Sequence, residues 1–229
     1  MTAIATQATT GDDNNPVPVA VIVTFTGGFL DAFTYVGHGG VFANSMTGNV
    51  VLLGVFSAAA DWRQVLNHIP PLVSFIVGIY LVHQAHVSKY EKNFRRFAGI
   101  MLLVEILCLL AIALLPASFP DNIIVPAIAF VASVQYESFA RIGNYNYSSV
   151  TSTVNMKRLA EAIYDHRVTR TPETGKRLRL FGLLSLAFIA GALAGAVSTR
   201  NMSNASLCIP VILLTVVVLL TARQLANPH

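Results

Sequence analysis

The chain has 229 residues, of which 54% are hydrophobic and only 11% are charged, and its mean hydropathy is +0.62. Because an ordinary soluble domain carries about 25% charged residues, this composition is that of a bilayer protein and excludes a water-soluble enzyme or binding module. The net charge of +4 does not indicate a nucleic-acid surface, since the basic residues lie mainly in two loops and are not interleaved with aromatic residues.

Polar tails are expected at both ends of the chain. Residues 1–16 have no basic start and carry Asp12 and Asp13 before the first apolar stretch, which is typical of a disordered tail and not of a secretory signal peptide. Residues 223–229 form the second tail. The predicted membrane part therefore covers residues 17–222.

Between the tails, six apolar runs approach the roughly 20 residues that a helix needs to cross the hydrocarbon. They cover residues 17–36, 69–87, 98–116, 123–142, 180–198 and 206–222. We predict a transmembrane helix over each.

Two further stretches are ambiguous. Residues 41–60 are apolar apart from a few polar residues near their start, and a helix is expected over residues 50–60. Residues 148–164 contain several charged side chains, too many to span comfortably. We predict that both are re-entrant or partly inserted, while a full crossing stays the alternative.

Two polar clusters stand 106 positions apart, Thr47-Gly48-Asn49 and Thr153-Val154-Asn155. At the same separation Asp31 aligns with Glu137. An acid, a glycine and a Thr-x-Asn thus recur in one order, each at the end of an apolar run. This pattern indicates an internal duplication, which is a recurring feature of transporters.

Basic residues decide how many stretches cross, because cytoplasmic loops carry an excess of Lys and Arg. With six spans, the second and fourth loops lie on one side and hold Lys89, Lys92, Arg95, Arg96, Lys157, Arg158, Arg167, Arg170, Lys176 and Arg177. The opposite side receives only Arg63 and Arg200. Eight spans would put the two basic loops on opposite sides, and so would seven, the second choice. We therefore favour six spans with both termini in the cytoplasm.

Three spans per repeat is an odd number, so the second repeat must enter the membrane from the opposite side. The predicted fold is all-α: a polytopic integral membrane protein with about six transmembrane helices, arranged as two inverted three-helix repeats with re-entrant or partly inserted polar segments. The first repeat covers residues 17–116 and the second covers residues 117–222. Polar segments at membrane depth must be buried in protein or line a polar cavity.

The polar clusters also carry a family resemblance. The run Gly28-Phe29-Leu30-Asp31-Ala32-Phe33-Thr34-Tyr35, followed by Val41-Phe42-Ala43-Asn44-Ser45-Met46-Thr47-Gly48-Asn49, resembles the signature of the YoaK family of uncharacterised bacterial membrane proteins. Gln135, Ser138-Phe139 and residues 145–158 are similar to that family's second region, although Val154 stands where the family more often has glycine. The resemblance implies a multi-span protein of the bacterial cytoplasmic membrane, without an established activity.

Asp31 and Glu137 are the sharpest functional candidates. A carboxylate costs about 2.5 to 3.5 kcal/mol at the centre of a transmembrane helix and less towards the interface. Both acids lie roughly 7 Å from a predicted span end, so the cost is partial. The alternative interpretation is an acid that reaches water or accepts a hydrogen bond from a neighbouring helix.

The polar residues around Gly48 stand where a helix is expected to begin. Because Ser, Thr and Asn are natural N-caps, they can simply start the helix. Alternatively, Gly48 lets an anionic or strongly polar solute approach the free N–H groups of the helix N-terminus. The predicted solute-binding residues are Asp31, Asn44, Ser45, Thr47, Gly48, Asn49, Gln135, Glu137, Thr153 and Asn155.

Glu105 lies in the middle of an apolar run and must be paired, protonated or turned to a cavity. It is a candidate proton relay, and a protonated glutamate bonded between helices is the alternative. Cys108 and Cys208 lack the spacing of a metal site and are expected to be buried thiols. No cofactor or metal is predicted.

The leading functional hypothesis is a transporter or channel for a small polar solute, with the lipid bilayer and that solute as partners and no nucleic acid. A membrane scaffold is the alternative, because Gly191 and Gly195 form a small-residue face that also leaves homo-oligomers open. A membrane enzyme is the weakest hypothesis, since motifs such as HExxH, GxSxG and the P-loop are lacking. We therefore predict that the protein is not an enzyme.

Overall fold

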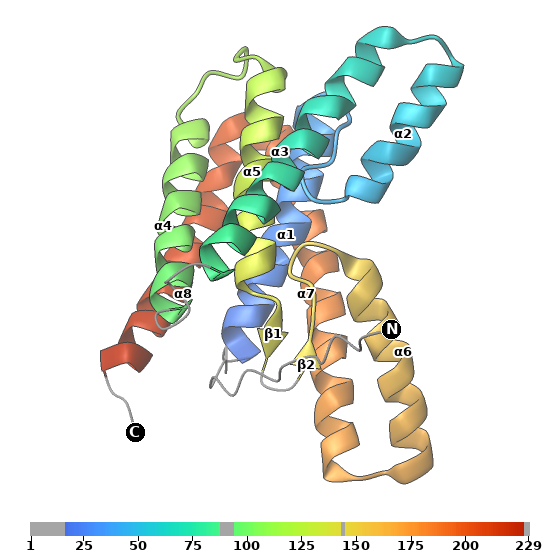
Figure 1. Ribbon diagram of the computed structural model, residues 1–229, viewed down its shortest axis with the longest axis vertical. Coiled ribbons are helices and arrows are strands. Elements are labelled where there is room, and N and C mark those ends of the chain that lie inside the picture. The colour runs from blue at the N-terminus through green and yellow to red at the C-terminus, as the bar shows by residue number, and fades with distance from the viewer. Residues whose placement is uncertain (1–16, 88–93, 143–144, 227–229) are drawn as a thin grey trace.

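The computed structural model describes residues 17–87, 94–142 and 145–226, and nearly all of them are helical (Figure 1). The predicted N-terminal tail, Lys89, Lys92 and the end of the C-terminal tail lie outside the described residues. The elements are α1 (Val17–Gly37), α2 (Met46–Ala58), α3 (Trp62–Val87), α4 (Phe94–Ala113), α5 (Asp121–Ser138), β1 (Arg141–Ile142), β2 (Tyr145–Asn146), α6 (Ser152–Thr169), α7 (Pro172–Met202), the 3₁₀ turn η2 (Ser203–Leu207) and α8 (Cys208–Ala226). The prediction of an all-α fold is confirmed, apart from the antiparallel pair β1 and β2.

Each predicted apolar run forms a helix, namely α1, α3, α4, α5, α7 and α8. The helices α3 and α7 are longer than the runs, because polar residues at their ends continue the helix beyond its apolar part. Thr171 is the N-cap of α7, and its side chain accepts a hydrogen bond from the backbone N–H of Thr174. Pro172 follows at the first helical position, where the fixed φ angle of proline suits a helix.

Within the described part of the chain, three stretches are long and apolar enough to cross a membrane. They are Val17–Gly37, Trp62–Gln84 and Pro172–Leu220, the last of which covers α7, η2 and most of α8. The helices Met46–Ala58 and Gly99–Ala113 are apolar but shorter.

The helix α2 starts at Met46, earlier than the expected residue 50, so the Thr-Gly-Asn cluster forms its first turn. With 13 residues, α2 is about 20 Å long, too short for the roughly 30 Å of hydrocarbon. The charged helix α6 has 18 residues and runs beside α7. In Figure 1, α2 lies at one end of the molecule and α6 at the other.

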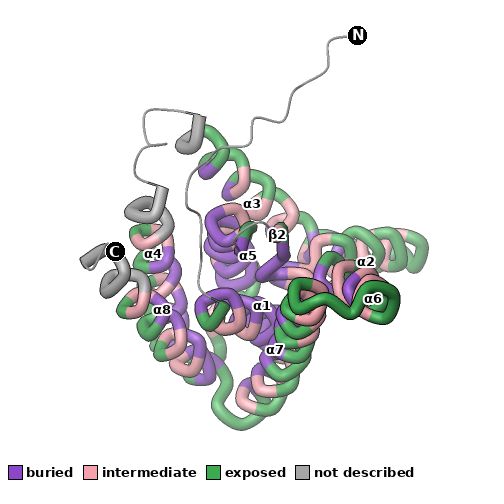
Figure 2. The backbone as a smooth tube through the Cα atoms, turned by 90° about the horizontal axis from the view of Figure 1, so that it is seen from below, coloured by how far each residue is buried: buried purple, intermediate pink, exposed green. Residues whose placement is uncertain are grey.

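The helices pack in matched pairs. Helix α1 packs against α7 and α5 against α3; α2 packs against α3 and α6 against α7; α4 packs against α5 and α8 against α1. If the helices of the first half (α1 to α4) are exchanged one by one for those of the second half (α5 to α8), each packed pair becomes another packed pair of the same set. Figure 2 shows the buried residues concentrated on α1, α5 and their neighbours, with exposed residues on the outer helices.

Glycines bring α1 and α7 into close backbone contact. A Cβ atom added at Gly191 would lie 2.0 Å from the carbonyl oxygen of Phe25, and one at Gly195 would lie 2.5 Å from that of Phe29. The predicted small-residue face is therefore used within the chain. The pair α3 and α5 is similar, because a Cβ at Gly78 would lie 3.0 Å from the carbonyl oxygen of Phe130.

Candidate functional site

The segments that precede α2 and α6 meet at Gly27, which lies at the middle of the 21-residue helix α1. The Asn44 side-chain amide donates a hydrogen bond of 2.8 Å to the Gly27 carbonyl. A Cβ atom at Gly27 would lie 2.1 Å from the carbonyl oxygen of Ser149. The approach of Ser149 requires a glycine at position 27, because a Cβ atom would collide with its carbonyl. From this point α2 runs towards one end of the molecule and α6 towards the other (Figure 1), so their N-termini converge.

Asp31 lies one turn beyond Gly27 on α1 and holds the segment before α2. Its Oδ1 accepts hydrogen bonds from the backbone N–H groups of Asn44 (2.7 Å) and Ser45 (3.2 Å), and its Oδ2 accepts one from the Ser45 hydroxyl (2.5 Å). Ser45 occupies the N-cap position of α2 but makes no side-chain cap bond to that helix. The buried carboxylate therefore supplies the negative charge that a helix N-terminus favours.

Asn49 and Asn155 make the same contacts at matching positions. The Asn49 side chain accepts a bond from the backbone N–H of Phe42 (2.9 Å) and donates one to its carbonyl (2.7 Å). The Asn155 side chain does the same with the N–H (3.1 Å) and carbonyl (2.7 Å) of Ser148. Both asparagines are 0% exposed. Both side chains therefore close the turns that precede α2 and α6.

The other members of the two clusters lie elsewhere. Thr47 and Thr153 are exposed on the first turns of α2 and α6. Gly48 packs under the Phe42 ring, since a Cβ atom there would lie 2.9 Å from a ring carbon. The Phe42 ring in turn stacks on Tyr35, with centroids 4.7 Å apart. Gly48 therefore makes room for an aromatic side chain at the start of α2.

Glu137 is not held as Asp31 is. It is half-buried, and no hydrogen bond or ion pair to it is found in the described ranges. At the start of α6, hydroxyls replace the acid: the Ser148 Oγ accepts a bond from the Thr151 N–H (3.0 Å) and contacts the Thr151 Oγ1 (2.8 Å). The two halves therefore share the asparagine turn but not the acid.

Glu105 and Gln135 are brought together between α4 and α5. The Gln135 Nε2 donates to both carboxylate oxygens of Glu105, at 3.0 and 3.2 Å. The carboxyl is 1% exposed. Its paired, buried state matches one of the options predicted for it, while a proton relay stays a prediction. This pair is distant in sequence from the Gly27 contacts and joins a different pair of helices.

Three polar contacts, at two places in the fold, were missed by sequence reasoning. His38, just after α1, contacts Asp121 at the start of α5 (2.7 Å). No local pattern relates residues that are 83 positions apart. On α6, Glu161 and Asp165 bind Arg177 of α7 at 3.0 and 2.7 Å. The spacing of these acids, one helical turn, could have indicated a common face.

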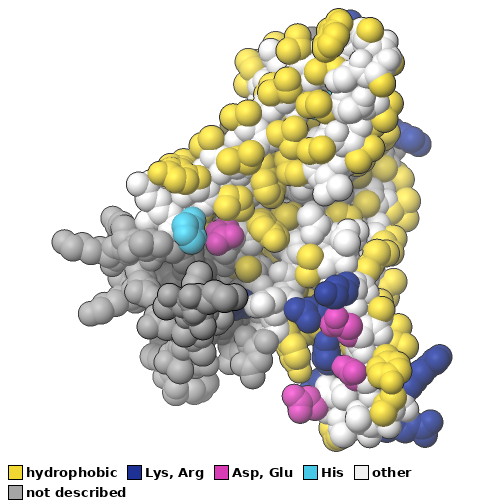
Figure 3. Space-filling model, turned by 45° about the vertical axis from the view of Figure 1, so that its right-hand side comes forward, with side chains coloured by type: hydrophobic (Ala, Val, Ile, Leu, Met, Phe, Trp, Pro, Cys, Tyr) yellow, Lys and Arg dark blue, Asp and Glu magenta, His cyan; other side chains and the backbone are white. Residues whose placement is uncertain are grey.

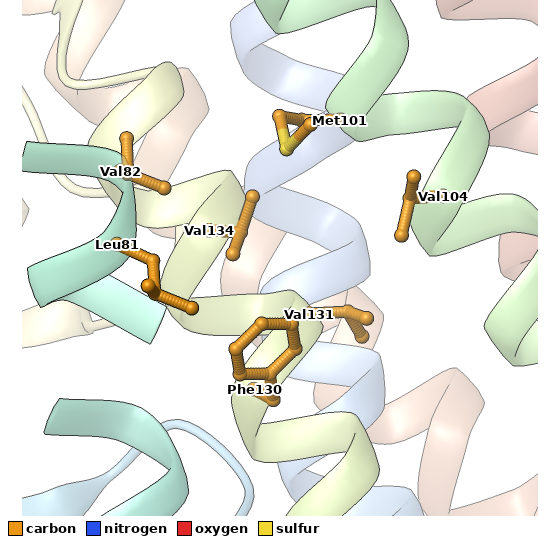
Figure 4. A pocket seen from close by; sticks show the side chains of 7 residues that line it. All are labelled: Leu81, Val82, Met101, Val104, Phe130, Val131 and Val134. Carbon is orange, nitrogen blue, oxygen red and sulfur yellow. The ribbon is translucent and has the colours of Figure 1, made fainter. Parts of the chain in front are cut away.

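One pocket in the described part of the chain is apolar and is lined by residues distant in sequence from Gly27. It has a volume of about 280 Å³ and lies between α3, α4 and α5 (Figure 4). Its lining consists of Leu81, Val82, Met101, Val104, Phe130, Val131 and Val134. It offers no polar group to a polar solute. Among the described residues, no group of three or more His, Cys, Asp or Glu side chains could hold a metal ion.

Comparison with known proteins places the chain in a family. A family model described as "Protein of unknown function (DUF1275)" matches residues 19–220. The chain belongs to this family. It is also 26% identical over 200 residues to the UPF0700 transmembrane protein YoaK of Bacillus subtilis (strain 168), a match that covers 84% of this chain and 88% of that protein. The resemblance inferred from the two polar regions is confirmed, and the chain is a membrane protein. No solved structure matches it.

Proposed function

We propose that the protein moves a small polar solute across the bacterial cytoplasmic membrane, as a channel or transporter. The observation that carries this proposal is the convergence of two non-helical segments on Gly27, halfway along an apolar helix. Backbone that is not helical is tolerated at membrane depth only when it is buried in protein or lines a polar cavity. Broken helices that meet at mid-depth are a recurring design of solute sites.

The architecture that we propose has six spans in two inverted repeats, residues 17–116 and 117–222. Three observations support it: the asparagine turns match at one sequence offset, the helix pairs exchange between the halves, and α2 and α6 run in opposite directions. Figure 3 shows most of the visible charged side chains gathered at the end of the molecule where α6 and α7 join, while hydrophobic side chains predominate towards the opposite end. By the positive-inside rule, the charged end and both termini are cytoplasmic.

This topology predicts which loops react from outside the cell. Single cysteines replace Asp61, Ser118 or Thr169 in a variant that lacks Cys108 and Cys208. We expect an impermeant maleimide to label the cysteines at positions 61 and 118 in intact cells, and the one at 169 only after permeabilisation. The reason is that α2–α3 and α4–α5 turn at one end of the molecule and α6–α7 at the other (Figure 1). Labelling of positions 118 and 169 from the same side would rule out the inverted arrangement.

Solute flux in proteoliposomes of the purified protein tests the function itself. Liposomes with oriented, monodisperse protein are loaded and challenged with gradients of neutral polar solutes, anions and cations. We expect at least one class to move faster than in protein-free liposomes. If no class moves, the transport proposal fails. No observation then favours a scaffold through the Gly191 and Gly195 face, because that face is already packed against α1.

A further inference from the structure

Three residues that contact or flank Gly27 each carry a buried side-chain oxygen that has no partner among the described residues. These oxygens are the Oδ1 of Asn44, the Oγ of Ser149 and the Oγ1 of Thr24. Asn44 and Ser149 both touch Gly27, and Thr24 lies one turn before it on the face of α1 that also carries Asp31. All three residues are at most 1% exposed.

Thr24 differs from Thr34, which lies nearly three turns further along α1. The Thr34 hydroxyl donates to the carbonyl of Leu30 (3.1 Å) and accepts from the N–H of Ala43 (3.0 Å). Such bonds satisfy a hydroxyl inside a helix, and the Thr24 hydroxyl makes none within the described part of the chain. An unpaired buried polar group is costly, so a polar molecule bound beside Gly27 would relieve that cost for the residues next to it.

The charges at this place nearly cancel. Each helix N-terminus carries roughly half a positive charge, so the converging ends of α2 and α6 together present about one. Asp31 opposes them with one carboxylate, which accepts hydrogen bonds at both oxygens, the pattern of the ionised group. Neither a cation nor an anion therefore finds a net counter-charge there, and helix N-termini that face a path also exclude cations.

We propose that the solute is an uncharged molecule with O–H or N–H donors, such as a small polyol or a urea-type amide, and that it binds beside Gly27. This proposal rests on the transport function proposed above. The Asn44 oxygen is an acceptor only and requires a donor from the solute, whereas the Ser149 and Thr24 hydroxyls can donate or accept. An apolar solute would leave all three oxygens unpaired.

Proteoliposome swelling with glycerol and urea, beside potassium and chloride flux, separates the two proposals. We expect the two neutral solutes to enter faster than in protein-free liposomes and both ions to be retained. Entry of an ion without either neutral solute would overturn the uncharged-solute proposal but leave transport standing. Retention of all four would overturn both.

Two variants locate the solute at Gly27. Ser149→Ala and Thr24→Val each remove a hydroxyl that has no protein partner, so the fold loses no hydrogen bond. We expect each to slow glycerol entry about fivefold, the effect of one lost hydrogen bond. Ser138→Ala is the matched control, because Ser138 is also buried and its hydroxyl also has no partner among the described residues, but it lies at the end of α5. Unchanged entry in both variants, or equal slowing in the control, would overturn the site.

Discussion

Replacing Gly27 with alanine is expected to lower the apparent melting temperature of the purified protein sharply and to reduce the yield of monodisperse material. The added methyl would lie 2.1 Å from the Ser149 carbonyl oxygen and 3.0 Å from the Cα of Val150. These are backbone atoms and cannot rotate away. The cost is about 3 kcal/mol, the upper end of what overpacking costs, because the segment before α6 must leave α1.

Gly54→Ala is the control for this variant. Gly54 also lies in a helix, but a Cβ atom there meets nothing within 4 Å. Alanine should leave the protein unchanged or stabilise it by up to about 1 kcal/mol, the difference in helix propensity. Equal melting temperatures for the two variants would mean that the contact between α1 and the segment before α6 is looser than described. The convergence at Gly27 would then lose its structural basis.

The helices were predictable because a helix that crosses a bilayer needs about 20 predominantly apolar residues, and such runs are easily recognised in a sequence. Each of α1, α3, α4, α5, α7 and α8 contains one long, predominantly apolar run, so the run locates the helix without any knowledge of its partners. The two asparagines that close the turns before α2 and α6 stood out in the sequence for a similar reason, although their role in the turns was not predicted. Asn49 and Asn155 are polar residues in apolar surroundings, and each acts within a few residues of its own position.

The central contacts could not be predicted, because they join residues that are distant in sequence. Asn44 and Ser149 both contact Gly27, but Ser149 belongs to the other half of the chain and no local pattern relates it to α1. The sequence offset also misled in one place: it paired Asp31 with Glu137, whereas only Asp31 holds a helix start through hydrogen bonds. The offset aligns the two acids by position, but it does not show whether either side chain is near enough to bond the segment before α2 or α6.

Asp31 has two separable roles in this structure, and two substitutions distinguish them. It bonds the backbone of Asn44 and Ser45, and it carries the negative charge that opposes the helix ends. Asp31→Ala removes both. It leaves two N–H groups and the Ser45 hydroxyl without their acceptor, and the expected cost is about 3 kcal/mol or more, since one hydrogen bond to a charged group is worth about 1.5–3 kcal/mol. A purified Asp31→Ala protein should therefore melt well below the parent.

Asp31→Asn removes only the charge. Its Oδ1 can still accept from the two backbone N–H groups, and the Ser45 hydroxyl can turn to accept from the new amide. We expect normal expression and monodispersity, a small change in melting temperature, and a chloride leak in proteoliposomes, because the ends of α2 and α6 are then no longer opposed. Potassium should stay excluded. If Asp31→Asn fails to fold, the carboxylate has a structural role alone; if it folds and retains chloride, the charge of Asp31 does not set selectivity.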